Sequence, residues 1–192
     1  MLSIRAATLA DLETVVALRL TLLREEHDCP IYGRVRADAV RRARHLYRAQ
    51  LESPVEVTLL AERDGVARGI LRCVESNGHP LLDPDRYAYV SSVYVVPEAR
   101  RAGVVRALLD RASQWCRDRG LDEMRLHSAA GSTTANAAWD ALGFRVVEHL
   151  RRRAVPAAID ERLTTTRADA PATPRGHRVD PIRASTRARI ER

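Results

Sequence analysis

The sequence predicts an α/β fold in which a mixed sheet carries helices on both faces. Segments with strand-like alternation and segments with helical periodicity follow each other in the order β-α-α-β-β-β-α-β-α-β. Asp64-Gly65 separates two β-rich runs and predicts a two-residue hairpin turn. An apolar strand expected over residues 86–96 leads into a glycine-containing loop and a helix. These features predict one layered domain.

The first elements are a strand in LSIRAAT and two helices. Thr8 is a candidate N-cap, and Asp11 follows three residues later near the positive end of the helix. The first helix has an apolar stripe at Leu12, Val15, Val16, Leu20 and Leu23. Residues 27–35 read as a loop. A second helix is predicted over residues 37–51, with a stripe of Val40, Ala43, Tyr47 and Leu51.

The strand expected at residues 86–96 is apolar or aromatic on both of its sides. Strict alternation places Tyr87, Tyr89, Ser91, Val93 and Val95 on one face. It places Ala88, Val90, Ser92, Tyr94 and Val96 on the other. A strand buried on both faces lies inside a sheet, so we expect this strand to be central.

The remaining elements alternate between helix and strand. A helical stripe runs from Val104 to Cys116 and ends at Gly120. DEMRLHS predicts a strand, TTANAAWDAL a short helix before Gly143, and FRVVEHLRR a last strand over residues 144–152. We therefore place the folded domain at residues 1–153.

Most of the net charge of +7 belongs to the C-terminal segment. Residues 151–192 hold 11 arginines and 5 acids, whereas residues 1–150 hold 21 arginines and 20 acids. The arginine- and proline-rich segment 154–192 has no aromatic residue, and we expect it to be disordered. The nearly neutral domain does not favour nucleic acid. The tail could contact a polyanion weakly, or it could be only a solvated extension.

The chain shows no membrane or secretion signal. It contains no apolar run long enough to cross a bilayer, and its N-terminus does not resemble a secretory signal. Cys29, Cys73 and Cys116 are scattered and odd in number, which predicts neither a disulfide framework nor a metal site. We expect a cytoplasmic protein without a metal, whose cysteines serve as small buried or half-buried hydrophobes.

The loop at Gly103 has the features of an anion site. The first N–H groups of a helix have no intrahelical partner, and they attract phosphate together with the helix dipole. Gly103 lets the backbone approach a ligand, and Arg100, Arg101 and Arg106 add charge. The spacing matches neither common nucleotide-binding glycine motif. By itself, the loop could equally be a tight strand-to-helix connection with solvated arginines.

The segment VYVVPEARRAGVVRALL resembles the acyl-CoA-binding segment of the GNAT acetyltransferase superfamily. That family shows a strand ending in V-x-P, then [Q/R]-x-x-G-x-[G/A], then a helix. Here the strand ends at Val95-Val96-Pro97, and the motif runs through Arg100, Arg101, Ala102, Gly103, Val104 and Val105. The resemblance covers about residues 3–150, including the opening IRAATLADLETVVALR and the ending AAWDALGF.

The resemblance implies a mostly antiparallel GNAT-like sheet and an acetyl-CoA co-substrate. The backbone of Val93, Tyr94 and Val95 would pair with the pantetheine arm, and the loop from Arg100 to Arg106 would hold the pyrophosphate. The thioester would lie where the central strand separates from the RLHS strand. A primary amine of a small molecule or peptide would attack it directly. A homodimer is left open.

Several positions depart from the family pattern. Val105 adds a branched side chain where the motif has Gly or Ala, so the loop shifts or binds CoA more weakly. The Tyr that often serves as general acid falls at Trp139, whose indole only donates hydrogen bonds. Trp139 implies slow turnover, another proton source or no catalysis, or it simply packs its helix. The family's Asn before that Tyr falls at Ser132, with Asn136 one turn further on.

The resemblance leaves the general base unassigned. The central strand has Ser91 and Ser92 where relatives often have Glu. His127 is the favoured candidate, because it ends the strand beside the expected thioester and titrates in a suitable range. It could instead be a structural histidine. Glu75 and His79 are weaker candidates, and Glu98 reads as an acid at a helix start.

We therefore expect an N-acetyltransferase. Its acceptor cleft would lie between the first two helices and residues 77–86. Acids in this region would suit a cationic amine or would be solvated loop charges: Glu25, Glu26, Asp28, Asp83 and Asp85. The alternative is a catalytically weak or inactive acyl-CoA-binding sensor or interaction module. A third reading makes the basic tail the functional part.

Overall fold

The computed structural model describes residues 1–155 of the 192-residue chain, and residues 1–147 form a compact unit. From residue 156 onwards, the segment expected to be disordered lies outside the described residues. One five-stranded sheet organises the unit, in the order β1-β2-β3-β4-β5. The strands are β1 (Leu2–Ala6), β2 (Glu56–Arg63), β3 (Val66–Asn77), β4 (Arg86–Val95) and β5 (Met124–Leu126).

The first three strand pairs are antiparallel, and β4 and β5 are parallel. The expected mixed, mostly antiparallel sheet is confirmed. The hairpin at Asp64-Gly65 is also confirmed. Both residues have positive φ, 54° and 74°, as the common two-residue hairpin turn requires.

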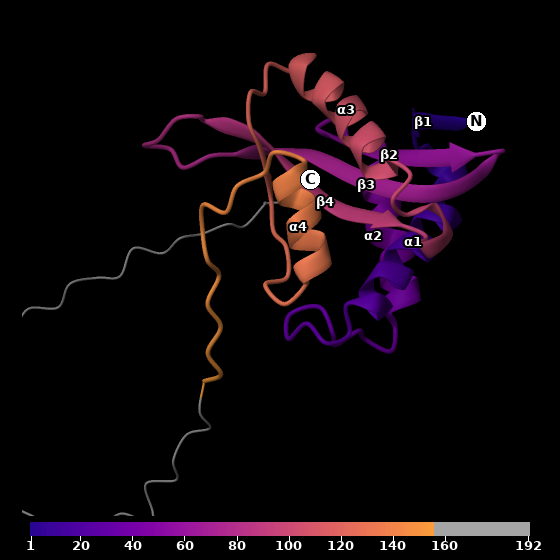
Figure 1. Ribbon diagram of the computed structural model, residues 1–192, viewed down its shortest axis with the longest axis horizontal. Coiled ribbons are helices and arrows are strands. Elements are labelled where there is room, and N and C mark those ends of the chain that lie inside the picture. Colours follow the sequence, from indigo (N-terminus) through magenta and orange to yellow (C-terminus); the bar gives the residue numbers. More distant parts are fainter. Residues whose placement is uncertain (156–192) are drawn as a thin grey trace, which may run out of the picture. The chain divides into compact units, whose positions relative to one another are not determined.

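Helices cover both faces of the sheet, as predicted (Figure 1). α1 (Leu12–Glu25) and α2 (Ala39–Glu52) pack on one face, where Leu60 and Ile70 meet Val15 and Tyr47. α3 (Val104–Arg117) packs on the other face, and α4 (Thr133–Ala141) adds the half-buried Trp139 to the same cluster. No helix within residues 1–155 has both the length and the apolar character needed to cross a bilayer.

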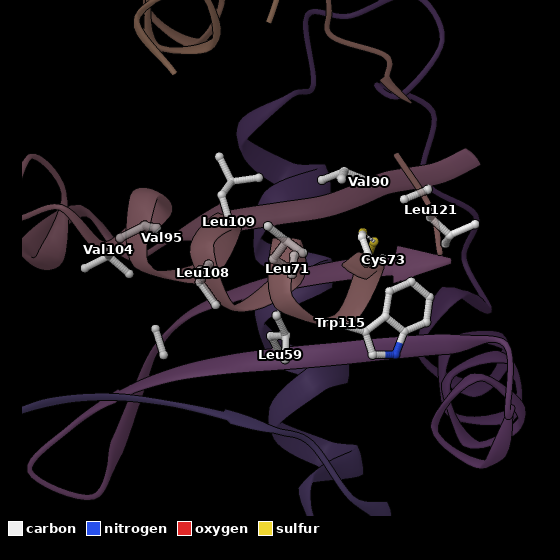
Figure 2. Packing of buried hydrophobic residues seen from close by; sticks show 14 of the residues in the cluster. Leu59, Leu71, Cys73, Val90, Val95, Val104, Leu108, Leu109, Trp115 and Leu121 are labelled. Carbon is white, nitrogen blue, oxygen red and sulfur yellow. Dashed lines mark hydrogen bonds between the residues drawn. The ribbon is translucent and has the colours of Figure 1, made fainter. Parts of the chain in front are cut away.

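The larger core lies between the sheet and α3 (Figure 2). Alternate residues of β2 and β3 point to this side, and the helical stripe predicted from Val104 to Cys116 covers them. Leu59, Leu71 and Leu108 are fully buried. The Cys73 and Cys116 sulfurs lie 3.9 Å apart within this core. Both cysteines therefore occupy the buried positions expected of small hydrophobes.

The junction between β1 and α1 is held by charge-assisted hydrogen bonds. Thr8 precedes a short 3-10 turn (Leu9–Asp11) rather than α1 itself, and its N–H donates to the Asp11 carboxylate at 2.8 Å. Arg5 donates to Asp11 at 2.7 and 2.8 Å and to Glu62 at 2.6 Å. These hydrogen bonds from Arg5 hold the pKa of Asp11 well below its usual range.

A bulge interrupts β4 and corrects the predicted alternation. Ile70 pairs with Tyr94, but Arg72 pairs with Ser91, so β4 has one extra residue at this point. Ser92 has φ +56°. Ala88 and Val90 face α3, and so do Val93 and Val95 beyond the bulge, whereas Tyr94 faces α1 and α2. The assignment of residues 87–96 to two unbroken faces was therefore wrong.

The predicted last strand is also wrong. Residues 144–155 contain no helix or strand, and Val146, Val147 and Leu150 are 73–90% exposed. The sequence alternates as a strand does, but alternation alone does not create a strand, and residues 144–155 pair with none of the five strands. The strand predicted at residues 122–128 forms only over its middle, as β5.

Candidate functional site

The N-terminus of α3 has the geometry of an anion site. Gly103 is its N-cap residue, with φ +75°, a left-handed conformation that favours glycine. A Cβ built on Gly103 would meet no atom within 4 Å, so the backbone here is open to an approaching ligand. The N–H groups of the first turn of α3 lack intrahelical partners. The loop can therefore present N–H donors and a helix dipole to a phosphate.

Val105 follows the loop in the first turn of α3. Its side chain is half-buried and packs against the core between the sheet and α3, next to the buried Val104. Part of the branched side chain that departs from the motif therefore contacts the core, and its effect on CoA binding stays a prediction. Arg101, Ala102 and Arg106 are exposed beside the open loop.

Arg100 is bound within the protein. Its Nε donates to the Val95 carbonyl at 2.9 Å, and its Nη2 donates to the Glu25 carboxylate at 2.5 Å. Tyr94 donates its hydroxyl to the same carboxylate at 2.7 Å. Burial alone would raise the pKa of Glu25, but these hydrogen bonds outweigh it and lower that pKa. Arg100 thus ties the loop to the end of α1.

The edge of β4 is open beside the loop. β5 pairs with β4 only from Ala88 to Val90, and beyond Val90 no strand within residues 1–155 pairs with this edge. The backbone of Val93, Tyr94 and Val95 follows directly. Unpaired strand N–H and C=O groups can accept an extended ligand as an added strand.

His127 follows β5 and meets Tyr89 of β4. The Tyr89 hydroxyl and His127 Nδ1 share a hydrogen bond of 2.8 Å, and the two rings lie 5.5 Å apart. Burial raises the pKa of the Tyr89 phenol, so it stays protonated at neutral pH. A hydrogen bond through Nδ1 leaves Nε2, the second ring nitrogen of this exposed histidine, for another partner.

A fixed cation lies under the bulge. Arg72 of β3 forms an ion pair with the buried Glu56 through Nε and donates through Nη1 to the Ser91 hydroxyl at 3.3 Å. Arg72, Arg19, Tyr47 and Ser92 line a narrow crevice between the sheet and the first two helices, together with Val15 and Ile70. The bulge therefore places Ser91 and Ser92 on the side of α1 and α2.

The weaker acid–base candidates Glu75, His79 and Glu98 have surroundings that differ from those of His127. Glu75 forms an ion pair with Arg86 at 2.7 Å, and His79 Nδ1 accepts the Leu81 N–H in the connection between β3 and β4. This connection projects beyond the sheet in Figure 1. Glu98 is exposed in a short 3-10 turn (Pro97–Ala99).

The acids considered for a cationic acceptor do not form a cluster among the described contacts. The Glu25 carboxylate accepts hydrogen bonds from Tyr94 and Arg100, and the Asp28 side chain is 94% exposed beside His27. Asp83 and Asp85 are exposed in the β3–β4 connection. Glu26 is half-buried, and this burial raises its pKa. Among the described residues, no cluster of three or more His, Cys, Asp or Glu could hold a metal.

Trp139 lies in α4, and Ser132 immediately precedes this helix. Trp139 packs edge-to-face on Phe144 at 5.5 Å and contacts the core. Ser132 is the N-cap residue of α4, and its carbonyl accepts the Asn136 N–H at 2.9 Å. The Asn136 side chain accepts from Ser128 and donates to the Ala129 carbonyl, which holds the loop after His127. The roles of Trp139 and Ser132 stay predictions.

Sequence reasoning missed Tyr89, Arg72 and Arg19 as site residues. The alternation had already placed Tyr89 and Ser91 on one face, and that part of the strand precedes the bulge. The adjacent serines in an otherwise apolar strand were the available signal for the bulge. Arg72 and Arg19 gave no signal, because this chain uses arginine for every cation.

Residues 20–144 match the family model described as the acetyltransferase (GNAT) family. This span includes the open β4 edge, the Gly103 loop and the Tyr89–His127 pair. The chain belongs to the GNAT acetyltransferase family. Membership makes it an acyltransferase and confirms the resemblance that its glycine loop suggested.

A curated GNAT relative is aminoglycoside N(6')-acetyltransferase type 1 of Klebsiella aerogenes, which is 32% identical over 101 residues. The match covers 51% of this chain and 64% of the relative, so the chain spans slightly less than two thirds of that protein.

Two solved structures show the same fold. A predicted acetyltransferase from Clostridium acetobutylicum, solved with acetyl-CoA, has a TM-score of 0.67 and 18% identity, covering 80% of this chain and 96% of that chain. Aminoglycoside 6'-N-acetyltransferase from Acinetobacter baumannii has a TM-score of 0.67 and 19% identity, covering 82% and 99%.

Proposed function

We propose that this chain is an acetyl-CoA-dependent N-acetyltransferase that acetylates a primary amine of a small molecule or peptide. The observation that carries the proposal is the Gly103 loop at the N-terminus of α3, next to the open edge of β4. The loop suits a pyrophosphate and the edge suits an amide-containing arm, and together they match the two polar parts of acetyl-CoA. The GNAT structure solved with acetyl-CoA supports the same assignment.

The binding residues follow from this placement. Backbone groups of Val93, Tyr94 and Val95 would hold the pantetheine arm. The loop from Arg100 to Arg106, with Arg101, Ala102, Gly103, Val104 and Val105, would hold the pyrophosphate. Ser132 would add a contact from the start of α4. The bound co-substrate supplies an activated acetyl thioester.

His127 is the proposed base. An alkyl amine with a pKa near 10.4 must lose its proton before it can attack. If His127 Nδ1–H donates to the Tyr89 oxygen, Nε2 is free to accept this proton. The neutral amine nitrogen then forms a bond to the acetyl carbon, the C–S bond breaks, and the thiolate of CoA leaves. The nitrogen releases its remaining extra proton to solvent and becomes a neutral amide. A thiolate with a pKa near 8.5, by analogy with cysteine, needs little help in leaving.

Trp139 fits this scheme as a residue that packs α4. Its indole donates hydrogen bonds but cannot supply a proton as an acid. A cytoplasmic location stays an expectation, based on the scattered cysteines and on the membrane and secretion signals that the sequence does not show.

The alternative is a sensor that binds acyl-CoA without turnover, suggested by the two departures from the family motifs at Trp139 and Val105. Thiol release from acetyl-CoA across a panel of amines, peptides and aminoglycosides separates the two functions. Acetyl-CoA at about 100 times its Kd should stabilise the fold by about 2.7 kcal/mol in thermal denaturation. Stabilisation without thiol release would favour the sensor, and no stabilisation at millimolar acetyl-CoA would exclude both functions.

A further inference from the structure

A second hollow lies beside the proposed reaction centre. It is formed by α1, residues 31–36 and α2, and its volume is about 590 Å³. In Figure 1 this part of the chain is the indigo to purple segment below the sheet. We call it the α1–α2 groove. Its apolar lining includes Leu20 and Leu23, together with Ile31, Val35 and Leu46, which are 45–51% exposed. Apolar surface gathered in a hollow is typical of a ligand site.

The rim of the α1–α2 groove is positively charged. Arg34, Arg36, Arg41 and Arg42 line it, and no Asp or Glu is among its described lining residues. Asp38 lies nearby and pairs with Arg36, Arg41 and Arg42 at 3.5, 2.7 and 2.8 Å. Arg34 has no ion pair within residues 1–155. One carboxylate cannot neutralise four guanidinium groups, so the rim attracts anions.

Tyr47 connects the α1–α2 groove with the bulge of β4. It lines both this groove and the crevice that contains Arg72 and Ser92. Ser92 and the Arg72-bonded Ser91 form the bulge of β4, which directly precedes the open edge at Val93. The inner wall of the groove therefore adjoins the part of β4 at which the pantetheine arm is proposed to bind.

We propose that the α1–α2 groove binds the body of the acceptor, an amine with an apolar chain that ends in a carboxylate or another anionic group. This proposal rests on the proposed function and specifies its substrate class. The apolar lining removes the chain from water, and the arginine rim binds the anion through charge-assisted hydrogen bonds. The amine end extends out of the groove, and His127 accepts its proton.

The charge of the rim opposes a polycationic acceptor. An aminoglycoside carries several ammonium groups, which the arginines would repel. Carbon chains of one length with different ends isolate this effect. Octylamine, ω-aminooctanoate and octamethylenediamine share the reactive amine and the apolar chain, but their far ends are neutral, anionic and cationic.

The test measures thiol release by the full chain with acetyl-CoA and each of these three amines. We expect kcat/KM to be highest for ω-aminooctanoate, about tenfold above octylamine, and lowest for the diamine. Arg34→Gln should remove most of the advantage of the carboxylate. Arg48→Gln is the matched control, because Arg48 is exposed on α2 outside the groove lining, and it should keep that advantage.

A binding measurement separates this proposal from the proposed function. Octanoate should stabilise the full chain in thermal denaturation, and Arg34→Gln should weaken the effect. Octanoate binding without acetylation of any amine would uphold the groove and reject the enzyme. Equal acetylation of the three amines, or faster acetylation of the diamine or an aminoglycoside, would overturn the groove proposal while the enzyme stands. A dimer that Leu46→Glu disrupts would instead assign the groove to a second copy.

Discussion

At the scale of single residues, His127 and Tyr89 are the two side chains on which the proposed chemistry depends. They come from neighbouring parallel strands and meet where those strands separate. The pairing of β4 with β5 thus positions a group that sequence analysis could nominate only by its place at a strand end. The role assigned to each differs, since His127 exchanges the proton and Tyr89 positions His127.

Replacing His127 tests the base directly. His127→Gln should lower kcat/KM by about 100-fold or more, because general bases typically contribute 10²–10⁴-fold. Tyr89→Phe should cause a smaller loss and change the pH profile of kcat/KM, since it alters how Nδ1 is held. The measurement is thiol release from pH 5 to 9. His79→Gln is the control, and a loss there equal to that of His127→Gln would contradict the assignment.

Gly103 gives a second residue-scale prediction. Gly103→Ala should lower the free energy of unfolding by about 1 kcal/mol, because an L-residue is strained at φ +75°. Urea denaturation measures this change. Gly131→Ala is the matched control, because a Cβ there also meets nothing within 4 Å and its φ is not positive. Equal stability of the two variants would show that backbone conformation does not limit Gly103.

At the scale of elements, the helix α3 supports the loop through its buried side as well as its N-terminus. Val105→Ala should lower the free energy of unfolding by about 1 kcal/mol, because the half-buried side chain packs on the core. It should leave the Kd for acetyl-CoA unchanged within about twofold. Calorimetric titration measures that Kd. Markedly tighter binding by Val105→Ala would show that the valine obstructs the loop after all.

The junction of β1 and α1 predicts a stability that depends on pH. Arg5 lowers the pKa of Asp11 in the folded state, so this contribution is fully present above the unfolded value near 3.8 and is lost as the pH falls below it. Asp11→Asn should cost about 1 kcal/mol at pH 7, a modest figure because the Arg5 side chain is 42% exposed. The cost should shrink at pH 3.

Urea denaturation at both pH values checks this prediction. Glu13→Gln is the control, since its ion pair with Arg44 is exposed on both sides and should matter little. A cost of Asp11→Asn that is the same at pH 3 as at pH 7 would contradict the electrostatic explanation.

The elements also show what sequence patterns can and cannot predict. Helical stripes and the Asp64-Gly65 turn are local, so α1, α2, α3 and the β2–β3 hairpin were predicted within a few residues. The bulge at Ser92 depends on the register between two strands, and the strand predicted at residues 144–152 needed a partner. The meeting of Tyr89 with His127 also depends on pairing between separate strands, so alternation alone could not reveal it.

At the scale of the whole molecule, charge is distributed unevenly. Residues 1–150 are nearly neutral, whereas residues 151–192 carry a net charge of +6. Every group assigned to acetyl transfer lies between Tyr89 and Trp139, and the α1–α2 groove lies before them. We therefore expect the proposed chemistry to need only the domain predicted at residues 1–153, and a polyanion to bind the tail.

Ending the chain at Ala154 tests this separation. Thiol release with octylamine should keep its kcat/KM within about twofold, because no proposed site residue is removed. Any weak binding to duplex DNA should disappear, since it would depend on arginine contacts with phosphates and fall steeply with salt. A full-length variant with glutamines at the tail arginines controls for length. If the shortened chain lost activity and the glutamine variant kept it, the uncharged part of the tail would belong to the enzyme. If both lost activity, the arginines themselves would take part in the reaction, and the separation of body and tail would be wrong.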